Sequence, residues 1–265
     1  MTVVEESLPA ENPGFFRFLL DVIIHPRRAF TALRETNNRS WLIMAGLLVL
    51  FTLLPVVVAA PITSRIAAES IREALEAQSE AGQALPPEAQ QQATQIATNP
   101  IFTIVFPGVG AVIGLVFSWL IWSGALHLLS TIMGGSNSFG QMWRAVVWAW
   151  LPVAIRGLLQ TLFIRITGEV ITNPGLSGLV ADQRSIAEIV ARPPSTGQMV
   201  LQSLLGRVEL FTIWNLVLLV IAVWATARLS ARKSSLITLG LWLLFTLLGL
   251  IPVVISAMLS SGFSG

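Results

Sequence analysis

The sequence predicts an all-α, polytopic membrane protein with five transmembrane helices. Two observations indicate this fold class. Of the 265 residues, 54% are hydrophobic and only 11% are charged, whereas soluble domains are about 45–50% apolar and about 25% charged. Five stretches also stay apolar and nearly uncharged over about 20 residues, the length that a helix needs to cross the hydrocarbon core of a bilayer. Much of the surface is therefore expected to face lipid, where charge is costly.

The composition gives little support for enzymatic chemistry. The chain has no cysteine, which excludes disulfides, thiolate nucleophiles, zinc–thiolate sites and iron–sulfur clusters. His25 and His127 are its two histidines, and no phosphate-binding loop, nucleophile elbow or dinucleotide fingerprint occurs. The net charge of +2 gives no reason to expect a nucleic-acid partner. We therefore predict no enzyme activity, no catalytic residue, no metal site and no cofactor.

Residues 1–40 are predicted to form a cytoplasmic, amphipathic segment that lies in the membrane interface. An apolar block at residues 15–24 is interrupted by Arg17 and Asp21, and after Pro26 basic and apolar residues follow at helical spacing. Such a segment buries its apolar side in the interface and directs arginines toward anionic headgroups. The alternative is a soluble helix that packs on other cytoplasmic loops. Acidic residues near the N-terminus argue against a cleavable signal peptide.

Residues 41–260 are predicted to form one membrane domain. Charge-free stretches place its spans at about residues 40–64, 106–133, 145–164, 210–227 and 235–259. Pro100 and Pro107 break the start of the second span, which leaves a re-entrant segment open there.

Two outer loops, residues 65–100 and 165–209, connect the spans on one side. The first is rich in Ala and Glu, so it is expected to continue the first helix to about residue 81, before the Pro86-Pro87 pair. In the second loop, Thr196 is the predicted N-cap of a helix that leads into the fourth span.

The distribution of arginine and lysine predicts an inside N-terminus and an outside C-terminus. In that orientation the cytoplasmic segments 1–40, 134–144 and 228–234 carry nine basic residues, and the two longer outer loops carry six. Positive charge is retained on the cytoplasmic side of membrane proteins. Arginine supplies 15 of the 16 basic residues, which is typical of a GC-rich genome. We therefore expect an integral protein of a bacterial cytoplasmic (inner) membrane.

Two ionisable side chains fall within the predicted spans and are candidate functional residues. His127, toward the inner end of the second span, is either a proton-relay group or a neutral histidine held between helices. Arg156 follows Pro152 in the third span and either lines a substrate site or pairs with Glu209 or Glu169. No Asp or Glu falls in the core of a span. The lack of a relay partner favours a structural role for His127.

Three glycines of the second span are candidate helix-packing positions. Gly110 and Gly114 form a GxxxG pair, and Gly124 continues the small-residue surface. Small residues let helix backbones approach closely in a membrane. The partner helix could belong to the same chain or to a second copy, so a homo-oligomer is one expectation.

The Gly134-Gly135 pair predicts a tight connection between the second and third spans. Glycine adopts the positive φ angles that a short hairpin needs. Ser136 or Ser138 is then expected to cap the next helix near Phe139.

Three stretches carry a family resemblance. The first is His25-Pro26-Arg27-Arg28-Ala29-Phe30, before the span that begins at Trp41. The second is Gly134-Gly135-Ser136-Asn137-Ser138-Phe139, before Ala145, Ala149 and Pro152, and the third is Ile213-Trp214-Asn215-Leu216, before the basic turn Arg228–Lys233. In this order they resemble the Yip family of Ypt/Rab-interacting polytopic membrane proteins, in a bacterial form. The motif residues are Pro26, Arg27, Phe30, Gly134, Gly135, Phe139, Pro152 and Trp214.

The resemblance implies five spans, a cytoplasmic N-terminus and an exported C-terminus. Two features depart from the family pattern. Ala222 stands where a small residue, usually glycine, is expected in the fourth span. The long hydrophilic N-terminal region through which eukaryotic members meet small GTPases is absent, which makes a GTPase partner doubtful.

The expected function is that of a non-enzymatic scaffold or accessory subunit. It would act through helix–helix and cytoplasmic-face contacts with a larger membrane complex or transport machinery, with the lipid bilayer and a membrane protein as partners. One alternative is a stand-alone transporter or channel with Arg156 and His127 in its path. Another is a membrane-shaping or trafficking factor. The implied role rests on the family resemblance.

Overall fold

The computed structural model describes residues 14–35, 39–80, 82, 86–182 and 194–262. These residues form helices and contain no strand. Five helical segments among them are long and apolar enough to cross a membrane. The predictions of an all-α fold and of five spans are therefore confirmed.

The spans differ from the predicted ones mainly at their ends. The second is α5 (Phe106–Ile132), which continues a π-helical turn, η1 (Ile101–Val105), so no re-entrant segment occurs in it. The third begins earlier than predicted, because α6 (Phe139–Ala149) and α7 (Leu151–Thr167) together span the bundle. The remaining spans are α3 (Ser40–Glu80), α10 (Leu210–Ala227) and α11 (Ala231–Leu248), which α12 (Ile251–Gly262) continues.

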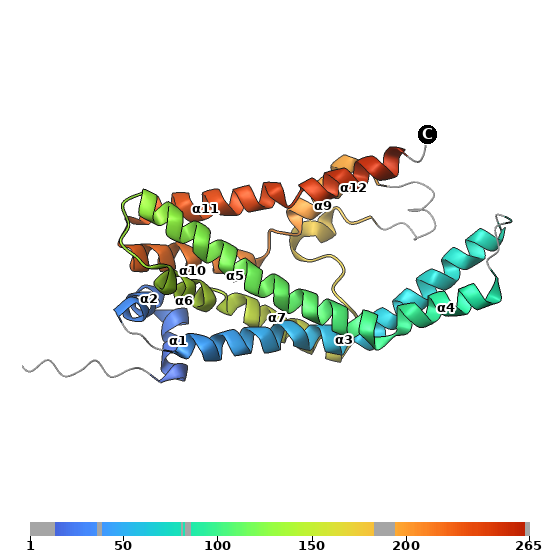
Figure 1. Cartoon of the computed structure of the whole chain (residues 1–265), viewed down its shortest axis with the longest axis horizontal. Coiled ribbons are helices and arrows are strands. Elements are labelled where there is room, and N and C mark those ends of the chain that lie inside the picture. Colours follow the sequence, from blue (N-terminus) through green and yellow to red (C-terminus); the bar gives the residue numbers. More distant parts are fainter. Residues whose placement is uncertain (1–13, 36–38, 81, 83–85, 183–193, 263–265) are drawn as a thin grey trace, which may run out of the picture.

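The first outer loop forms a helical arm. As predicted, α3 continues past its apolar part to Glu80, and α4 (Pro87–Thr98) returns beside it (Figure 1). The arm is polar and exposed, and the Nε of Arg72 donates to the Glu76 carboxylate at 2.9 Å. This hydrogen bond, and then the charge of Glu76, raise the pKa of Arg72. We call this side of the bundle the arm end.

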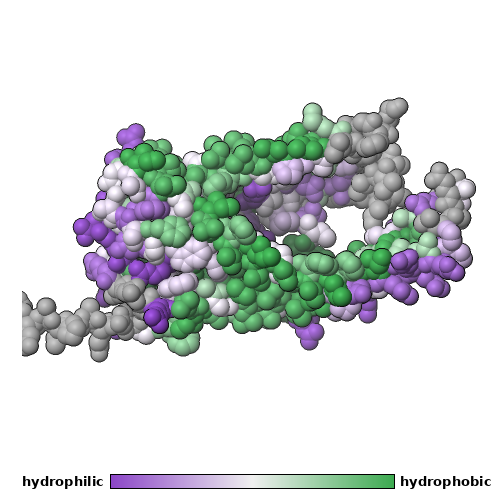
Figure 2. Space-filling view, viewed as in Figure 1, coloured by the Kyte–Doolittle hydropathy of each residue, from purple (hydrophilic) through white to green (hydrophobic). Residues whose placement is uncertain are grey.

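At the opposite end, α1 (Phe15–Ile24) and α2 (Pro26–Glu35) lie across the ends of the spans (Figure 1). The connection at residues 134–138 and the turn at residues 228–230 lie at the same end. The described basic residues there outnumber the acidic ones, so we call it the basic end. Figure 2 shows hydrophobic surface along the spans and hydrophilic surface toward the two ends.

The third span forms the centre of the bundle. Over its most apolar window 56% is buried, against 11% for α3 and 17% for the second span. Gly157 of α7 lies directly against the carbonyl oxygen of Phe51 in α3, where a Cβ atom would overlap it. The small residue therefore lets two backbones meet, as helices in membranes often do.

The third span is interrupted at Trp150. Pro152 has no backbone N–H and lies in the first turn of α7, where that loss costs least. The carbonyl of Ala149 at the break accepts a hydrogen bond of 2.7 Å from Nδ2 of Asn215. An asparagine of the fourth span thus satisfies a buried backbone group that the break would leave unpaired.

The second outer loop contains α9 (Thr196–Leu205) and a short 3₁₀ turn, η2 (Gly175–Leu179). The predicted N-cap Thr196 is wrong, because Ser195 caps α9 by accepting a hydrogen bond from the Gln198 N–H at 3.2 Å. Thr196 is instead the first helical residue. Serine and threonine are both good N-caps, so adjacent positions compete.

Candidate functional site

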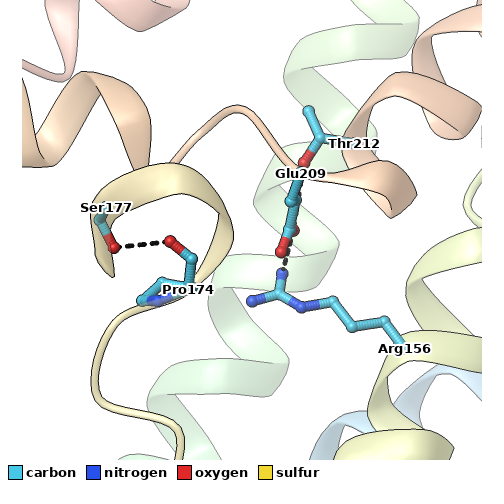
Figure 3. Close-up of polar contacts among 5 residues, drawn as sticks. All are labelled: Arg156, Pro174, Ser177, Glu209 and Thr212. Atoms are coloured by element: carbon cyan, nitrogen blue, oxygen red, sulfur yellow. Dashed lines mark hydrogen bonds and ion pairs between the residues drawn. The ribbon is translucent and has the colours of Figure 1, made fainter. Parts of the chain in front are cut away.

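Arg156 is paired inside the bundle. It lies on α7, one turn after Pro152, and its Nη1 is 2.8 Å from Oε1 of Glu209, the residue before α10 (Figure 3). The side chain of Glu209 is 14% exposed and that of Arg156 is 40% exposed. The hydroxyl of Thr212 also donates to Oε1 of Glu209, at 3.1 Å. Of the two predicted counter-ions, the structure brings Glu209 and not Glu169 to Arg156.

A cavity of about 420 Å³ opens beside this ion pair near the arm end. Its polar lining consists of Arg156, Gln160, Asn173 and Glu209. The wall formed by η2 depends on close packing, because Gly175 has φ +61° and a Cβ there would lie 2.7 Å from the carbonyl oxygen of Val208. The arrangement offers hydrogen bonds and a neutralised charge pair. It places no nucleophile beside a base.

Asn173 and Ser177 fix the loop that closes this cavity. The Ser177 hydroxyl donates to the carbonyl oxygen of Pro174 at 2.6 Å, which holds the turn (Figure 3). The side-chain amide of Gln202 in α9 donates to Oδ1 of Asn173 at 3.2 Å. This hydrogen bond therefore links the start of the second outer loop to α9, near its end.

His127 is not part of the Arg156 cavity. It lies five residues before the end of α5, and its ring faces that of Phe139 at 6.2 Å between centroids. Its buried Nδ1 has no hydrogen-bond partner among the described residues. Arg156 lies 17 residues from the start of the third span, and His127 lies five residues from the end of α5 at the same end of the bundle. The difference of 17 − 5 residues, at 1.5 Å per residue, separates the two positions in height by about 18 Å. The structure does not bring them together.

Most of the family-like motif residues gather at the basic end. Pro26 is the first residue of α2, and Phe30 of the same helix is fully buried. The guanidinium of Arg27 lies 4.0 Å from the ring centroid of Trp224, near the end of α10. The sequence analysis predicted no role for Trp224. Its position four residues before the basic segment Arg228–Lys233 was the signal that could have indicated one.

The Gly134-Gly135 connection locks the second, third and fourth spans together. Gly134 has φ +87°, as the predicted tight turn requires. A Cβ at Gly135 would lie 2.8 Å from the carbonyl oxygen of Ser130 and 3.1 Å from that of Ala227. The N–H of Ser136 donates to the same Ala227 carbonyl at 3.0 Å. The close approach of backbone explains why this position lacks a side chain.

The helix after this connection begins as predicted. Ser138 caps α6 at Phe139, and it forms a reciprocal capping box with Gln141. The side-chain amide of Gln141 also donates to the carbonyl oxygen of Arg34 at 3.2 Å. One residue therefore starts the third span and fastens α2 to it. Ser138, of the two predicted caps, is confirmed.

Pro152 and Trp214 lie apart from the other motif residues. Pro152 is buried at the helix break, and Trp214 packs against the core from the fourth span. Asn215, beside Trp214, holds the break through Ala149. This part of the motif therefore lies at the helix break in the middle of the bundle. The candidate functional roles of the motif residues stay predictions.

The three candidate packing glycines of α5 have open space around the position that a side chain would occupy, as far as the described residues go. No described heavy atom lies within 4 Å of a Cβ built at Gly110, Gly114 or Gly124. Gly110 and Gly114 are exposed. The predicted close packing is thus not made within the described chain, and packing against another chain stays a prediction.

Comparison with known proteins identifies the family. A family model described as the Yip1 domain matches residues 20–252, from within α1 to the start of α12. No curated protein and no solved structure matches the chain. The match includes the first four spans, both outer loops and most of the fifth span and of the basic end. The chain is an integral membrane protein that belongs to the Yip1 domain family.

Proposed function

We propose that the chain is a non-enzymatic scaffold or accessory subunit of a larger membrane complex. In this role it binds another membrane protein through the exposed face of α5 and through the basic end. The observation that carries the proposal is the composition of that α5 face. It combines open glycine positions with large apolar side chains.

The face lies opposite the side by which α5 packs on its own bundle. Leu115, Trp119 and Leu126 are the buried side. On the other side, Gly110 and Gly114 lie at helical spacing with the exposed Phe117 and Ile121.

Lipid tails are as apolar as leucine, so helices in a bilayer associate through close packing and hydrogen bonds. Glycine hollows with flanking bulky side chains provide the shape that such packing needs. The spacing on α5 is therefore suited to a partner helix from another chain.

The transporter alternative has less support. Arg156 is neutralised by Glu209, and His127 lies about 18 Å away along the bundle by helix rise. A proton or ion path needs a series of polar groups within hydrogen-bond reach of one another. Substrate-dependent flux in liposomes that disappears in Arg156→Ala would favour the transporter over our proposal.

The test is co-purification with matched glycine variants. The full chain, tagged at its N-terminus, is extracted from its native membrane in mild detergent, and its companions are identified and quantified by mass spectrometry. We expect a stoichiometric membrane protein with the wild type, and its loss in Gly110→Leu/Gly114→Leu. Gly240→Leu is the control, because Gly240 of α11 is equally exposed and open.

Two outcomes would contradict the proposal. In one, the wild type is monomeric and has no companion. In the other, a companion is retained equally by both leucine variants, which removes the α5 face from the contact. A second copy of the chain as the sole companion makes the scaffold a homo-oligomer.

A membrane-shaping role is the second candidate, and α1 supports it. Its buried face, with Phe18 and Val22, packs on the bundle. Its opposite face exposes Phe16 (78%), Leu20 (55%) and Ile24 (64%). An exposed apolar stripe beside arginines is suited to insertion at the headgroup level, where it displaces lipid.

Reconstituted vesicles test this candidate. If α1 shapes the membrane, Phe16→Gln/Leu20→Gln abolishes any change in vesicle diameter that the wild type causes, measured by cryo-electron microscopy. Leu128→Gln/Ile132→Gln is the control, since these exposed residues lie on α5 near the same end. Equal diameters with wild type and with empty vesicles reject the candidate.

The proposed orientation places the basic end in the cytoplasm of a bacterial cell, and the arm outside. The chain has no cysteine, so single substitutions give an unambiguous test. We expect a membrane-impermeant maleimide to label Ser79→Cys on the arm of intact cells. Thr31→Cys on α2 should react only after the membrane is opened. The reverse pattern overturns the orientation.

A further inference from the structure

The cleft between α2 and the end of α10 is lined by an excess of positively charged residues. It has a volume of about 310 Å³, and its lining includes Arg27, Thr31, Arg34, Glu35, Trp224 and Arg228. Three guanidinium groups thus face one carboxylate. Among the described residues none of these three arginines forms an ion pair.

The arginines of the cleft are held in place by the fold. Arg27 stacks on the ring of Trp224, which covers one face of the guanidinium and leaves the N–H groups in its plane available. Arg34 is half-buried on a helix that Gln141 ties to the third span. Arg228 ends α10 with φ +55°. Guanidinium groups positioned in this way are suited to phosphate oxygens.

An apolar groove lies on the same face of α10 as Trp224, one turn farther from the basic end. It has a volume of about 420 Å³ and is lined by Ile213, Val217, Val220 and Ile221 of α10 and by Ser235 and Leu239 of α11. Positions 213, 217, 220 and 224 are three or four apart, so they share one face of the helix, and Arg228 follows directly after the end of α10.

The length of the groove suits one leaflet. At 1.5 Å per residue, Ile213 to Ile221 spans about 12 Å. Half of a hydrocarbon core is about 15 Å thick. The hollow is therefore long enough for most of one acyl chain, directly beneath the cleft.

We propose that the cleft and the groove form one binding site for an anionic glycerophospholipid. The phosphate of the headgroup binds Arg27, Arg34 and Arg228, and one acyl chain occupies the groove between α10 and α11. A zwitterionic lipid leaves the excess positive charge uncompensated, and a free phosphate leaves the groove empty. The site does not depend on the accessory role proposed above.

Lipid titration of the full chain tests the site. The protein is purified in detergent, and binding of phosphatidylglycerol and phosphatidylcholine is measured by native mass spectrometry. We expect preferential retention of phosphatidylglycerol. Arg27→Gln/Arg228→Gln should weaken its binding about 25-fold, since each basic residue near an anionic headgroup contributes about fivefold. Arg17→Gln/Arg232→Gln is the matched control, because both arginines are exposed near this end and outside the cleft.

The groove is tested without changing charge. Val220→Trp fills it and should weaken phosphatidylglycerol binding about tenfold through lost acyl-chain burial. Leu244→Trp, on an exposed part of α11 outside the groove, should bind as the wild type does. Thermal unfolding without lipid checks that each variant is folded. If the double arginine variant fails to fold, Arg228→Gln alone, at an exposed position, should reduce the affinity for phosphatidylglycerol about fivefold.

Four results would overturn the proposal. The first is equal retention of the two lipids. The second is equal weakening by the cleft and control variants, which reduces the effect to the overall charge of the basic end. The third is full displacement of phosphatidylglycerol by inorganic phosphate, which assigns the cleft to a free anion. The fourth is unchanged phosphatidylglycerol binding in Val220→Trp, which removes the groove from the site.

Discussion

The two ends of the bundle are built differently. At the basic end, α1 and α2 cover the spans, Trp148 and Phe30 are fully buried, and connections of residues 134–138 and 228–230 hold neighbouring spans together. At the arm end, long connections leave an exposed helical arm and a polar cavity beside Arg156. Short connections cost little entropy to close and keep helix ends adjacent, whereas long ones allow them to separate.

This contrast indicates where the chain can form a water-excluding core. Lipid gives no hydrophobic drive between spans, so burial of large aromatic side chains needs covering elements such as α1 and α2. The Phe15 and Phe18 rings lie 5.5 and 4.7 Å from that of Trp148 between centroids. The basic end therefore contains large, fully buried aromatic side chains, and the arm end depends on individual polar contacts.

The largest effect is expected from breaking the basic end. Trp148→Ala removes a fully buried indole and should lower stability by about 3–5 kcal/mol, the usual cost of a large aromatic truncation. Leu75→Ala on the half-buried side of the arm should cost far less. Thermal unfolding in detergent measures both. A Trp148→Ala protein as stable as Leu75→Ala would contradict the contrast between the ends.

A smaller effect is expected from the ion pair of the arm end. Glu209→Gln leaves Arg156 without a counter-charge, and because the arginine is 40% exposed the cost should be about 1–2 kcal/mol. Arg156→Gln in addition should recover part of that loss. Unfolding of the two single variants and the double variant forms a complete cycle. If the changes in unfolding free energy of the two single variants add up to that of the double variant, the two side chains do not stabilise each other.

The smallest effect is expected on the arm itself. Arg72→Ala removes an exposed pair between residues four apart on a helix, and such pairs contribute little in water. We expect an unfolding temperature indistinguishable from that of the wild type in moderate salt. A clear loss of stability would mean that the arm is packed against something in the folded protein, and hydrogen exchange of residues 65–80 would then locate the contact.

Much of the fold could be predicted from the sequence. Hydrophobic length and the scarcity of charge indicate the five spans, because apolar helices pair nearly all of their backbone groups internally inside lipid. Gly134 and Ser138 were predictable because turns and caps are local. The cap at Ser195 was missed because Thr196 is an equally good local candidate.

The candidate sites were less predictable. Arg156 and its choice between Glu209 and Glu169 required knowledge of how the loop before α10 folds. The contact of Arg27 with Trp224 joins residues nearly 200 positions apart in the chain. No local pattern in either segment contains that contact.

Composition along the chain was enough to predict five membrane spans and the central part of each one, although not their exact ends. It was enough because transfer into lipid depends on the composition of each segment separately. Three features required the folded chain: Asn215 satisfies the break at Trp150, Glu209 neutralises Arg156, and α2 lies across the end of α10. Each of these features is a contact between residues far apart in the chain, and local sequence propensity carries no information about such contacts.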